Sequence, residues 1–550
     1  MSRRALIPIA VAALTATWFL PTLSGSFLNW DDNVNSLDNP AYRGLGVEQL
    51  RWAFTSVLFG HYVPLTRLSW RLNYVLGGMD PWGYHLVNVL LHGLNAATFY
   101  FVARRLLAAA VGAGGQAGRR EPALCAAAAV AALVFGAHPL RVEPVAWISG
   151  RADLLCATFA LLAGWAYLRA VEGEGSARPG PVLLSAAAFA AALLSKGGVL
   201  LLPAALILLD VYPLRRLSRR GWRALLGEKI PLLLVMLVGA VVIVRAVREG
   251  AVLTQASEFG AVARISVLAH SFLVSVARFI WPLALSPLYE MPARVSVLES
   301  RFGLALGATV LITVVLILAR RPWPGGLAAW TFSALMLAPT GMAVRMGADL
   351  APDRYTYLSG LGFATLAGGA ALTVIRLVHR GAIDPWRGWA AAAASLVAIA
   401  GLGATSWSFS QVWTQSETLW RWAVELDPDC GVCHGKLGES ALGGPGGAAR
   451  AVEAEGLFRR AIALRPDLPD AYFNLGTALV VQGRYAEAEA PLRSYRERVL
   501  AEPDAHGLRS QRVQALRGHA RELQARGRHA EADALLAEAR ALESARPGRR

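Results

Sequence analysis

Uncharged apolar runs, separated by short polar or basic loops, fill the first 410 residues of the chain. Runs of about 18 such residues are typical of membrane-spanning helices, because hydrocarbon leaves the backbone no water to bond. The pattern predicts eleven spans, at 5–22, 86–103, 123–140, 154–170, 181–195, 197–212, 230–247, 303–319, 325–343, 355–378 and 388–408.

A further apolar stretch, 265–288, contains His270, Arg278, Pro282 and Pro287. We expect it to form an interfacial or re-entrant helix and not a full crossing. The first span follows Met-Ser-Arg-Arg and lacks a small-residue cleavage site, so it is predicted to be a retained anchor.

The arginines predict the orientation of the spans. With eleven spans and a cytoplasmic N-terminus, the most basic loops fall on one side, as the positive-inside rule requires. These loops contain Arg104, Arg105, Arg119, Arg120, Arg215, Arg216, Arg219, Arg220, Arg223, Arg320, Arg321, Arg376, Arg380 and Arg387. Everything after residue 408 is then expected outside.

After residue 410 the sequence becomes rich in Ala, Glu, Arg and Leu at helical spacing. Val-Glu-Ala-Glu at 452–455 recurs as Ala-Glu-Ala-Glu at 486–489, an offset of 34 residues, which is the period of tetratricopeptide repeats. We therefore predict an all-α protein with three parts. Residues 1–410 form a polytopic bundle whose first outer loop is 23–85, residues 411–545 form an α-solenoid of about three repeats, and 546–550 are a basic tail.

Composition agrees with a membrane protein. Of the 550 residues, 55% are hydrophobic and only 17% are charged. This excludes a soluble enzyme, a disordered linker protein and a disulfide-stapled secreted module. The net charge of +16 is assigned to cytoplasmic loops and not to nucleic-acid binding.

The predicted topology gathers ionisable residues from distant loops on the outer surface. Asp31 and Asp32 lie in the first outer loop. Adjacent carboxylates repel, so such a pair can supply a general base, a metal ligand or both. Whether a divalent metal takes part is left open.

Cations accompany the two acids on this surface. Lys196 follows Ser195 at the tip of a tight hairpin, and Arg354 begins a span. Either can meet a lipid phosphate, and arginine can do so through two hydrogen bonds. The loop 138–153 adds His138, Arg141, Glu143, Arg151 and Asp153, and the alternative is a loop pinned by Arg151–Asp153 or Arg141–Glu143 pairs.

Several motifs extend this picture across nearly the whole chain. They are Trp-Asp-Asp-Asn at 30–33, Pro-Leu-Thr-Arg-Leu-Ser at 64–69, the segment 84–92, the loop 138–153, Leu-Ser-Lys at 194–196, Asp-Arg-Tyr-Thr-Tyr-Leu at 353–358 and Glu-Thr-Leu-Trp at 417–420. In order and spacing the chain resembles the transmembrane and tetratricopeptide-repeat-containing protein O-mannosyltransferases and their bacterial relatives, within the GT-C glycosyltransferases.

The resemblance implies transfer of a mannose-like sugar from a polyprenyl phosphate to a protein or glycan hydroxyl on the outer face. It assigns catalysis to Asp31 and Asp32. We expect Lys196, Arg354 and Arg151 to bind the donor phosphate, and the cavity to be shaped by His138, Glu143, Asp153, His85 and Arg67. Relatives often have Glu where this chain has Gly197, and a basic residue where it has Val63.

Cys430-Gly431-Val432-Cys433-His434 matches the pattern of c-type haem attachment. The same residues fit the first helix of a repeat, so a coincidental match is favoured over a local disulfide or metal contact, and haem comes last. No cofactor is therefore assigned.

Two other functions remain open: a lipid-diphosphate-dependent oligosaccharide ligase, and a non-enzymatic envelope-assembly scaffold whose repeats bind proteins. The expected location is the bacterial inner membrane, with the repeats periplasmic. Because stacked repeats contact mainly their neighbours, deletion of 425–550 is expected to spare turnover of a small acceptor.

Overall fold

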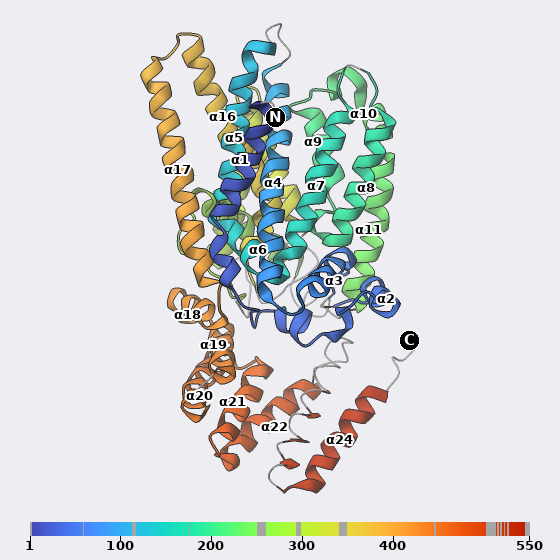
Figure 1. Ribbon diagram of the computed structural model, residues 1–550, viewed down its shortest axis with the longest axis vertical. Coiled ribbons are helices and arrows are strands. Elements are labelled where there is room, and N and C mark those ends of the chain that lie inside the picture. The colour runs from blue at the N-terminus through green and yellow to red at the C-terminus, as the bar shows by residue number, and fades with distance from the viewer. Residues whose placement is uncertain are drawn as a thin grey trace.

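A computed structural model describes residues 3–544, except 59, 113–116, 174, 250–259, 293–298, 340–348, 445–446, 502–512 and scattered positions within 514–526. The basic tail 546–550 lies outside the described residues. Within them the chain is helical, and its only β pairing is two isolated bridges. A helical bundle stands above a separate arc of repeat helices, so the predicted all-α class is confirmed (Figure 1).

The bundle consists of long helices that run roughly along one axis (Figure 1). These are α1 (Arg3–Thr17), α4 (Pro81–Val111), α5 (Ala117–Ala137), α7 (Arg151–Ala170), α8 (Pro179–Ser195), α9 (Leu202–Val211), α11 (Ile230–Glu249), α13 (Ala261–Ile280), α14 (Ser300–Leu318), α15 (Pro324–Leu337), α16 (Thr356–His379) and α17 (Pro385–Val412). Within the described part of the chain, seven helices are long and apolar enough to cross a membrane, or eight if the bent pair Glu121–Ala137 and Pro139–Ala146 is one span.

The predicted spans correspond to helices, with differences at their ends. The run 86–103 is part of the 31-residue helix α4, whereas the run 197–212 contains only ten residues of helix in α9. The run 123–140 ends at a 60° bend beside His138. The predicted span 325–343 corresponds to α15, which ends at Leu337, and its last residues, 340–343, lie outside the described residues. The number of complete crossings stays a prediction.

The stretch 265–288 was expected to form an interfacial or re-entrant helix. In the structure α13 is continuous for 20 residues, and Pro282 lies beyond its end. Its length and composition would allow a crossing. Two of its residues lie near the segment 350–353. Val267 packs in one cluster with Leu350, and Arg278 donates hydrogen bonds to the Ala351 carbonyl at 2.7 Å and to Asp353 at 3.1 Å. Whether α13 crosses the membrane or is interfacial or re-entrant stays a prediction.

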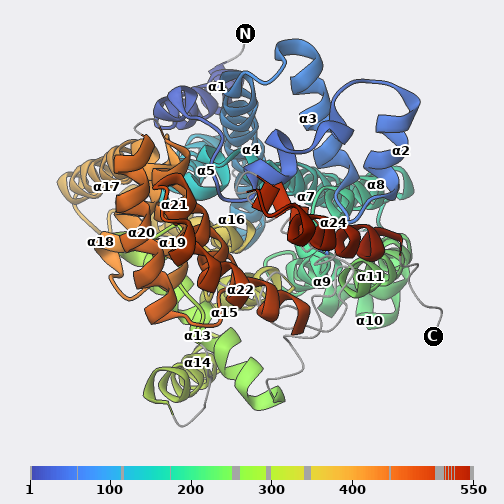
Figure 2. The same cartoon turned by 90° about the horizontal axis from the view of Figure 1, so that it is seen from below.

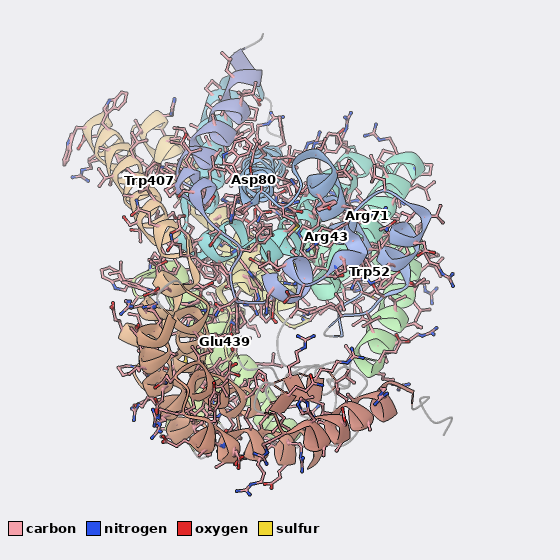
Figure 3. The ribbon with its side chains drawn as sticks, turned by 60° about the horizontal axis from the view of Figure 1, so that its bottom comes forward. Arg43, Trp52, Arg71, Asp80, Trp407 and Glu439 are labelled. Carbon is pink, nitrogen blue, oxygen red and sulfur yellow. A yellow bond between two sulfur atoms is a disulfide. The ribbon has the colours of Figure 1, made fainter. Side chains whose placement is uncertain are left out.

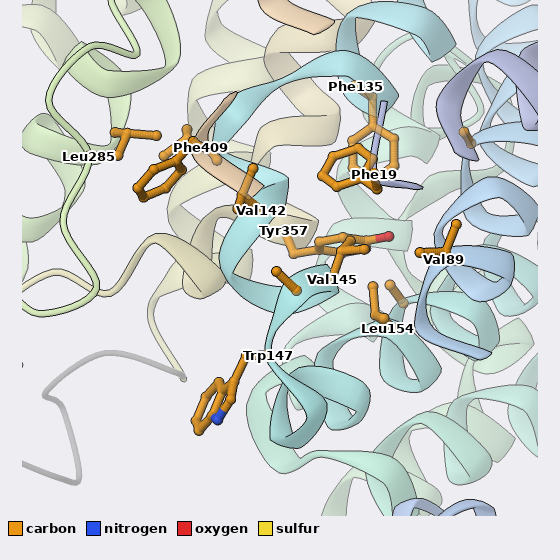
Figure 4. Packing of buried hydrophobic residues seen from close by; sticks show 14 of the residues in the cluster. Phe19, Val89, Phe135, Val142, Val145, Trp147, Leu154, Leu285, Tyr357 and Phe409 are labelled. Atoms are coloured by element: carbon orange, nitrogen blue, oxygen red, sulfur yellow. The ribbon is translucent and has the colours of Figure 1, made fainter. Parts of the chain in front are cut away.

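The bundle core depends on small residues and one aromatic cluster. A Cβ added to Gly368 of α16 would lie 2.6 Å from the Ala127 carbonyl of α5, so glycine allows these two helices to touch. Phe135 packs edge-on against Tyr357, with ring centroids 5.2 Å apart (Figure 4). The Tyr357 hydroxyl lies 2.7 Å from His92 Nδ1. The Tyr357 hydroxyl therefore has a hydrogen-bond partner within the apolar core.

One end of the bundle, here called the repeat-side end, gathers the segments 18–80, 138–150, 195–199 and 349–355 beside the repeats. Its first loop contains η1 (Leu20–Ser24), η2 (Asn33–Leu37), η3 (Pro40–Tyr42), α2 (Val47–Thr55) and α3 (Pro64–Gly77). Thr66 Oγ1 donates to the Ser195 carbonyl at 3.0 Å, and Asn35 donates to Ser149 at 3.0 Å. The N-terminus and the arginine-rich α10 (Leu217–Glu228) lie at the opposite end (Figure 1).

The repeat domain begins directly after α17. Its helices are α18 (Ser416–Leu426), α19 (Gly431–Gly443), α20 (Gly447–Leu464), α21 (Pro469–Val481), α22 (Tyr485–Ala501) and α24 (His529–Ser544). A Cβ on Gly438 or Gly476 would meet Phe458 or Leu492 of the next helix within 2.7 Å, so these glycines let paired helices pack closely. Seen from below, the helices follow an arc beneath the bundle (Figure 2).

We predict that Asp38→Cys and Asp470→Cys react with a membrane-impermeant maleimide in intact cells, whereas Ser218→Cys reacts only after permeabilisation. Residues 38 and 470 are exposed at the repeat-side end, and 218 is exposed at the opposite end. The other cysteines are buried or disulfide-bonded, so they give little background. Labelling of 218 but not of 470 in intact cells would reverse the predicted orientation.

Candidate functional site

Asp32 is a fully buried carboxylate at the start of η2. Its Oδ2 accepts a hydrogen bond from the Leu28 backbone at 3.0 Å. Its Oδ1 accepts two from Ser149, at 3.0 Å from the backbone and at 2.6 Å from the hydroxyl. Burial raises the pKa of Asp32 to about 7, although these hydrogen bonds oppose the shift. The carboxylate thus fastens the first loop to the segment 148–150.

Asp31 differs from its neighbour in exposure and backbone. Its side chain is partly exposed, and its φ of 65° lies in the left-handed region that non-glycine residues rarely adopt. Hydrogen bonds fix the backbone on both sides. Trp147 Nε1 donates to the Trp30 carbonyl at 2.7 Å, and Asn35 N donates to the Asp31 carbonyl at 2.8 Å. A strained residue held this way is typical of a functional position.

Lys196 caps the end of α8 and is paired with Asp153 of α7. Its Nζ donates to both carboxylate oxygens, each at 2.7 Å, and lies 5.4 Å from the centre of the Tyr355 ring. The Lys196 side chain keeps 14% of its surface exposed and that of Asp153 keeps 9%. The predicted cation therefore lies at the repeat-side end with a carboxylate that a competing anion would have to displace.

Arg354 is paired with Glu143, whose Oε2 also accepts the Arg354 backbone N–H at 2.7 Å. A second carboxylate, that of Asp349, lies with its Oδ2 3.5 Å from Arg354 Nη1. Burial raises the pKa of Asp349 to about 7, against the attraction of Arg354. The guanidinium lies 5.4 Å from the centre of the Trp147 ring, the same indole that bonds Trp30. Trp147 thus connects the cation to the acidic loop.

Arg151 was expected to bind the donor phosphate, but its contacts favour a structural role. It is fully buried. Its guanidinium donates to the Tyr84 carbonyl at 2.7 Å, to Asn73 at 2.9 Å, to Ser69 at 3.2 Å and to Asn88. These partners belong to α3 and α4. Arg151 therefore joins the first loop to the bundle, and neither of the expected pairs Arg151–Asp153 and Arg141–Glu143 is among the ion pairs of the described residues.

The residues expected to shape the cavity fall into two groups: partners of the two cations, and residues that support the loops. Glu143 and Asp153 are the partners of the two cations. His138 is buried, accepts from Leu140 N at 3.2 Å and bonds the Phe279 carbonyl at 2.9 Å, so it ties the loop to α13. His85 is buried beside Gly25, and Arg67 donates to the Ser56 carbonyl at 2.7 Å. The last three positions shape the site by supporting its loops.

No group of three metal-ligating side chains occurs among the described residues. Three hydrogen-bond donors already occupy the two oxygens of Asp32. The pair Asp31 and Asp32 therefore does not fit a resident metal in this arrangement, and no step below uses one.

The Cys430–Cys433 pair corrects the expectation of a coincidental match, because the two residues form a disulfide with Cα atoms 5.3 Å apart. Both cysteines are buried, and the Cys430 sulfur accepts from Cys433 N at the first turn of α19. The prediction of a repeat helix at this place stands. Thioether bonds to haem would need both sulfurs, which the disulfide occupies.

An apolar cavity of about 760 Å³ lies between α4, α7, α9, α15 and α16. It is lined mainly by Leu, Ala, Val and Phe side chains. Leu358, one lining residue, follows Tyr355 by one helical turn, and Leu202 begins α9 six residues after Lys196. The lining continues from Leu358 and Leu202 to Val111, Tyr212 and Trp323, so the cavity runs along the bundle toward the end opposite the repeats.

Ser149 and Asn29 belong to the site but were not predicted as site residues. Ser149 lies within the loop 138–153, and its neutral side chain gave no signal of its own. Asn29 precedes the Trp-Asp-Asp motif, and its side-chain hydrogen-bond partners lie 391 to 411 positions away in the sequence. Only the tertiary structure could reveal them.

Comparisons with known proteins agree with the motifs. A tetratricopeptide-repeat family model matches residues 447–512. Protein O-mannosyl-transferase tmtc2 of Xenopus laevis is 41% identical over 114 residues, which are 21% of this chain and 12% of that protein. The Homo sapiens protein O-mannosyl-transferase TMTC4 is 43% identical over 114 residues, which are 20% of this chain and 15% of that protein. The Drosophila melanogaster protein O-mannosyl-transferase Tmtc1 is 36% identical over 166 residues, which are 29% of this chain and 18% of that protein.

The aligned segments therefore span less than a fifth of those relatives. They confirm that this chain resembles these proteins. Among solved structures, ArnT from Cupriavidus metallidurans bound to undecaprenyl phosphate gives a TM-score of 0.37 at 17% identity, over 90% of this chain and 79% of that one.

We predict that the charge of Asp32 makes the protein less stable as the pH rises. The unfolded carboxyl has a pKa near 3.8 and the folded one about 7. The contribution of protonated Asp32 to the free energy of unfolding is thus fully present below pH 4. It is lost as the pH rises through 7, and the total loss is about 4 kcal/mol at most. In thermal melts of detergent-solubilised protein, Asp32→Asn should lose less stability than wild type between pH 5 and 8. The exposed Asp38→Asn is the control, and equal slopes for all three would contradict the raised pKa.

Proposed function

We propose that this chain is a membrane glycosyltransferase that moves one sugar from a polyprenyl phosphate to an acceptor hydroxyl at the repeat-side end. The observation that carries the proposal is the juxtaposition of a partly exposed acid in an uncommon backbone conformation and two ion-paired cations at that end. The names of the similar proteins suggest mannose as the sugar and a protein as the acceptor.

Asp31 acts as the general base in this proposal. It is the partly exposed acid of the pair, whereas Asp32 is buried and occupied by hydrogen bonds. Asp31 removes the proton from the acceptor hydroxyl while the oxygen attacks the anomeric carbon. The bond from that carbon to the phosphate oxygen breaks in the same step. One displacement of this kind inverts the anomeric configuration.

Lys196 and Arg354 stabilise the departing lipid phosphate. Both are ion-paired here, with Asp153 and Glu143, so the cations are already oriented before the donor arrives. Preorganised charge of this kind lowers the energy of a developing anion without reorganisation during the reaction. Tyr355, whose ring contacts both cations, positions them side by side.

The apolar cavity receives part of the polyprenyl chain. Its volume of about 760 Å³ is in the range of ligand sites, and its lining matches a branched hydrocarbon. Each buried methylene contributes about 0.8 kcal/mol. The proposed arrangement places the carrier within the bundle and the acceptor on the side of the repeats, which we infer to be extracytoplasmic.

We predict that Asp31→Asn lowers kcat by about 100-fold or more, the scale expected for loss of a positioned base. Asp38→Asn, an exposed acid of the same loop, should keep wild-type activity. The assay uses purified protein in liposomes with radiolabelled polyprenyl-phosphate mannose and a hydroxyl acceptor. Undiminished transfer by Asp31→Asn would remove the proposed base. Wild-type protein that transfers no sugar from this donor would favour the scaffold alternative.

We predict that Lys196→Ala weakens use of the donor, seen as a higher KM or a slower release of phosphate. Lys196→Arg should be milder because the charge persists. Asp153→Asn removes the competing carboxylate and should leave donor KM equal or lower. A higher donor KM for Asp153→Asn than for Lys196→Ala would show that the pair serves the fold and not the phosphate.

We predict that Gly164→Leu discriminates against long donors. Gly164 lines the cavity, and an added Cβ would meet no atom within 4 Å, so the larger side chain fills the cavity without displacing a helix. The KM of a long polyprenyl donor should rise about tenfold, and that of a short-chain analogue much less. Gly307→Leu, equally free of contacts but outside the cavity lining, is the matched control. Equal effects on both donors would place the lipid elsewhere.

A further inference from the structure

The first repeat helices touch the acidic loop itself. Asn29, directly before Trp30-Asp31-Asp32, is the centre of this contact. Its side-chain NH₂ donates to the Lys436 carbonyl at 3.0 Å, to Ser440 at 3.3 Å and to Glu439 at 3.4 Å. Glu439 lies at the edge of the repeat domain that faces the bundle (Figure 3). One amide thus joins the loop to α19 of the repeat domain.

Helix α18 completes the same contact from a second direction. The Trp420 indole donates to Asn29 Oδ1 at 2.6 Å, and its ring packs edge-on against Trp30 at 5.1 Å. The Ser416 hydroxyl accepts the Asn29 backbone N–H at 2.9 Å. Both polar groups of the Asn29 side chain are hydrogen-bonded, and Trp420 is fully buried. The orientation of residues 29 and 30 therefore depends on the repeat domain.

Asp31 is electrostatically coupled to the same helix. Burial lowers the pKa of Lys436, but the carboxylates of Glu439, Asp470 and Asp31 outweigh it and leave that pKa raised. The acidic loop is thus bounded on one face by Trp147 and Ser149 of the bundle and on the other by α18 and α19. The strained backbone of Asp31 lies between these two faces.

We propose that α18 and α19 are part of the catalytic unit, with Asn29 and Trp420 as positioning residues that hold Asp31 toward the acceptor. This inference rests on the proposed function and extends it. It reverses the expectation that the repeats can be removed without loss of turnover on a small acceptor, because removal would expose Trp30 and free the Asn29 side chain.

The test compares Trp420→Phe with Trp422→Phe in the full chain. The two tryptophans lie two residues apart in α18 and both donate from the repeat domain to the bundle. Trp422 bonds the Leu285 carbonyl at 2.8 Å, away from the acidic loop. Trp420→Phe keeps the ring on Trp30 but removes the bond to Asn29. It should lower kcat on a small hydroxyl acceptor about tenfold with donor KM unchanged, whereas Trp422→Phe should keep wild-type kcat.

Asn29→Ala approaches the contact from the bundle and should show the same fall in kcat with an unchanged donor KM. Thermal midpoints of the three variants should agree within a few degrees, which separates positioning from instability. Wild-type kcat in both Trp420→Phe and Asn29→Ala, with Asp31→Asn inactive, would overturn this inference and leave the proposed function intact. Full activity of Asp31→Asn would overturn the base and the positioning together.

Discussion

The repeat-side end depends on pairing each buried carboxylate with donors from a distant segment. A carboxylate or guanidinium removed from water is costly unless it is hydrogen-bonded. Asp32 meets this requirement through Ser149, Lys196 through Asp153, and Arg354 through Glu143. Because each pair joins two loops, the pairing sets the positions of the first loop, the hairpin and the start of α16 relative to one another.

Trp147 shows how these pairs become one site. Its ring faces the Arg354 guanidinium, and its N–H bonds the Trp30 carbonyl. The positions of Arg354 and of the Trp30 backbone are therefore coupled through one rigid side chain. Through this side chain the segment of the proposed base and one of the proposed cations are held in a fixed relation.

Besides the Trp422 bond to Leu285, two groups of contacts fasten the repeat domain to the bundle among the described residues. One is the Asn29 contact, and the other is Glu290, whose carboxylate accepts from Gly431 N at 2.7 Å and from Arg465 at 2.7 Å. A carboxylate at the N-terminus of α19 is favoured by the helix dipole. The Cys430–Cys433 disulfide fixes the same turn, so the motif that resembled haem attachment stabilises a domain junction.

Sequence alone determined the helical class, the basic end, the repeat period and the acids of the first loop, because composition and periodicity are local properties of the chain. It also placed Lys196, Glu143 and Arg354 on one surface, since topology follows from counting spans. For the loop 138–153, however, it left open pairs between sequence neighbours, Arg151 with Asp153 or Arg141 with Glu143, and it favoured a coincidental match for the cysteines. The tertiary structure decided these points, as well as the Asn29 contact. Partners of buried charges are chosen by distance in space, and residues almost 400 positions apart carry no mutual signal in the chain.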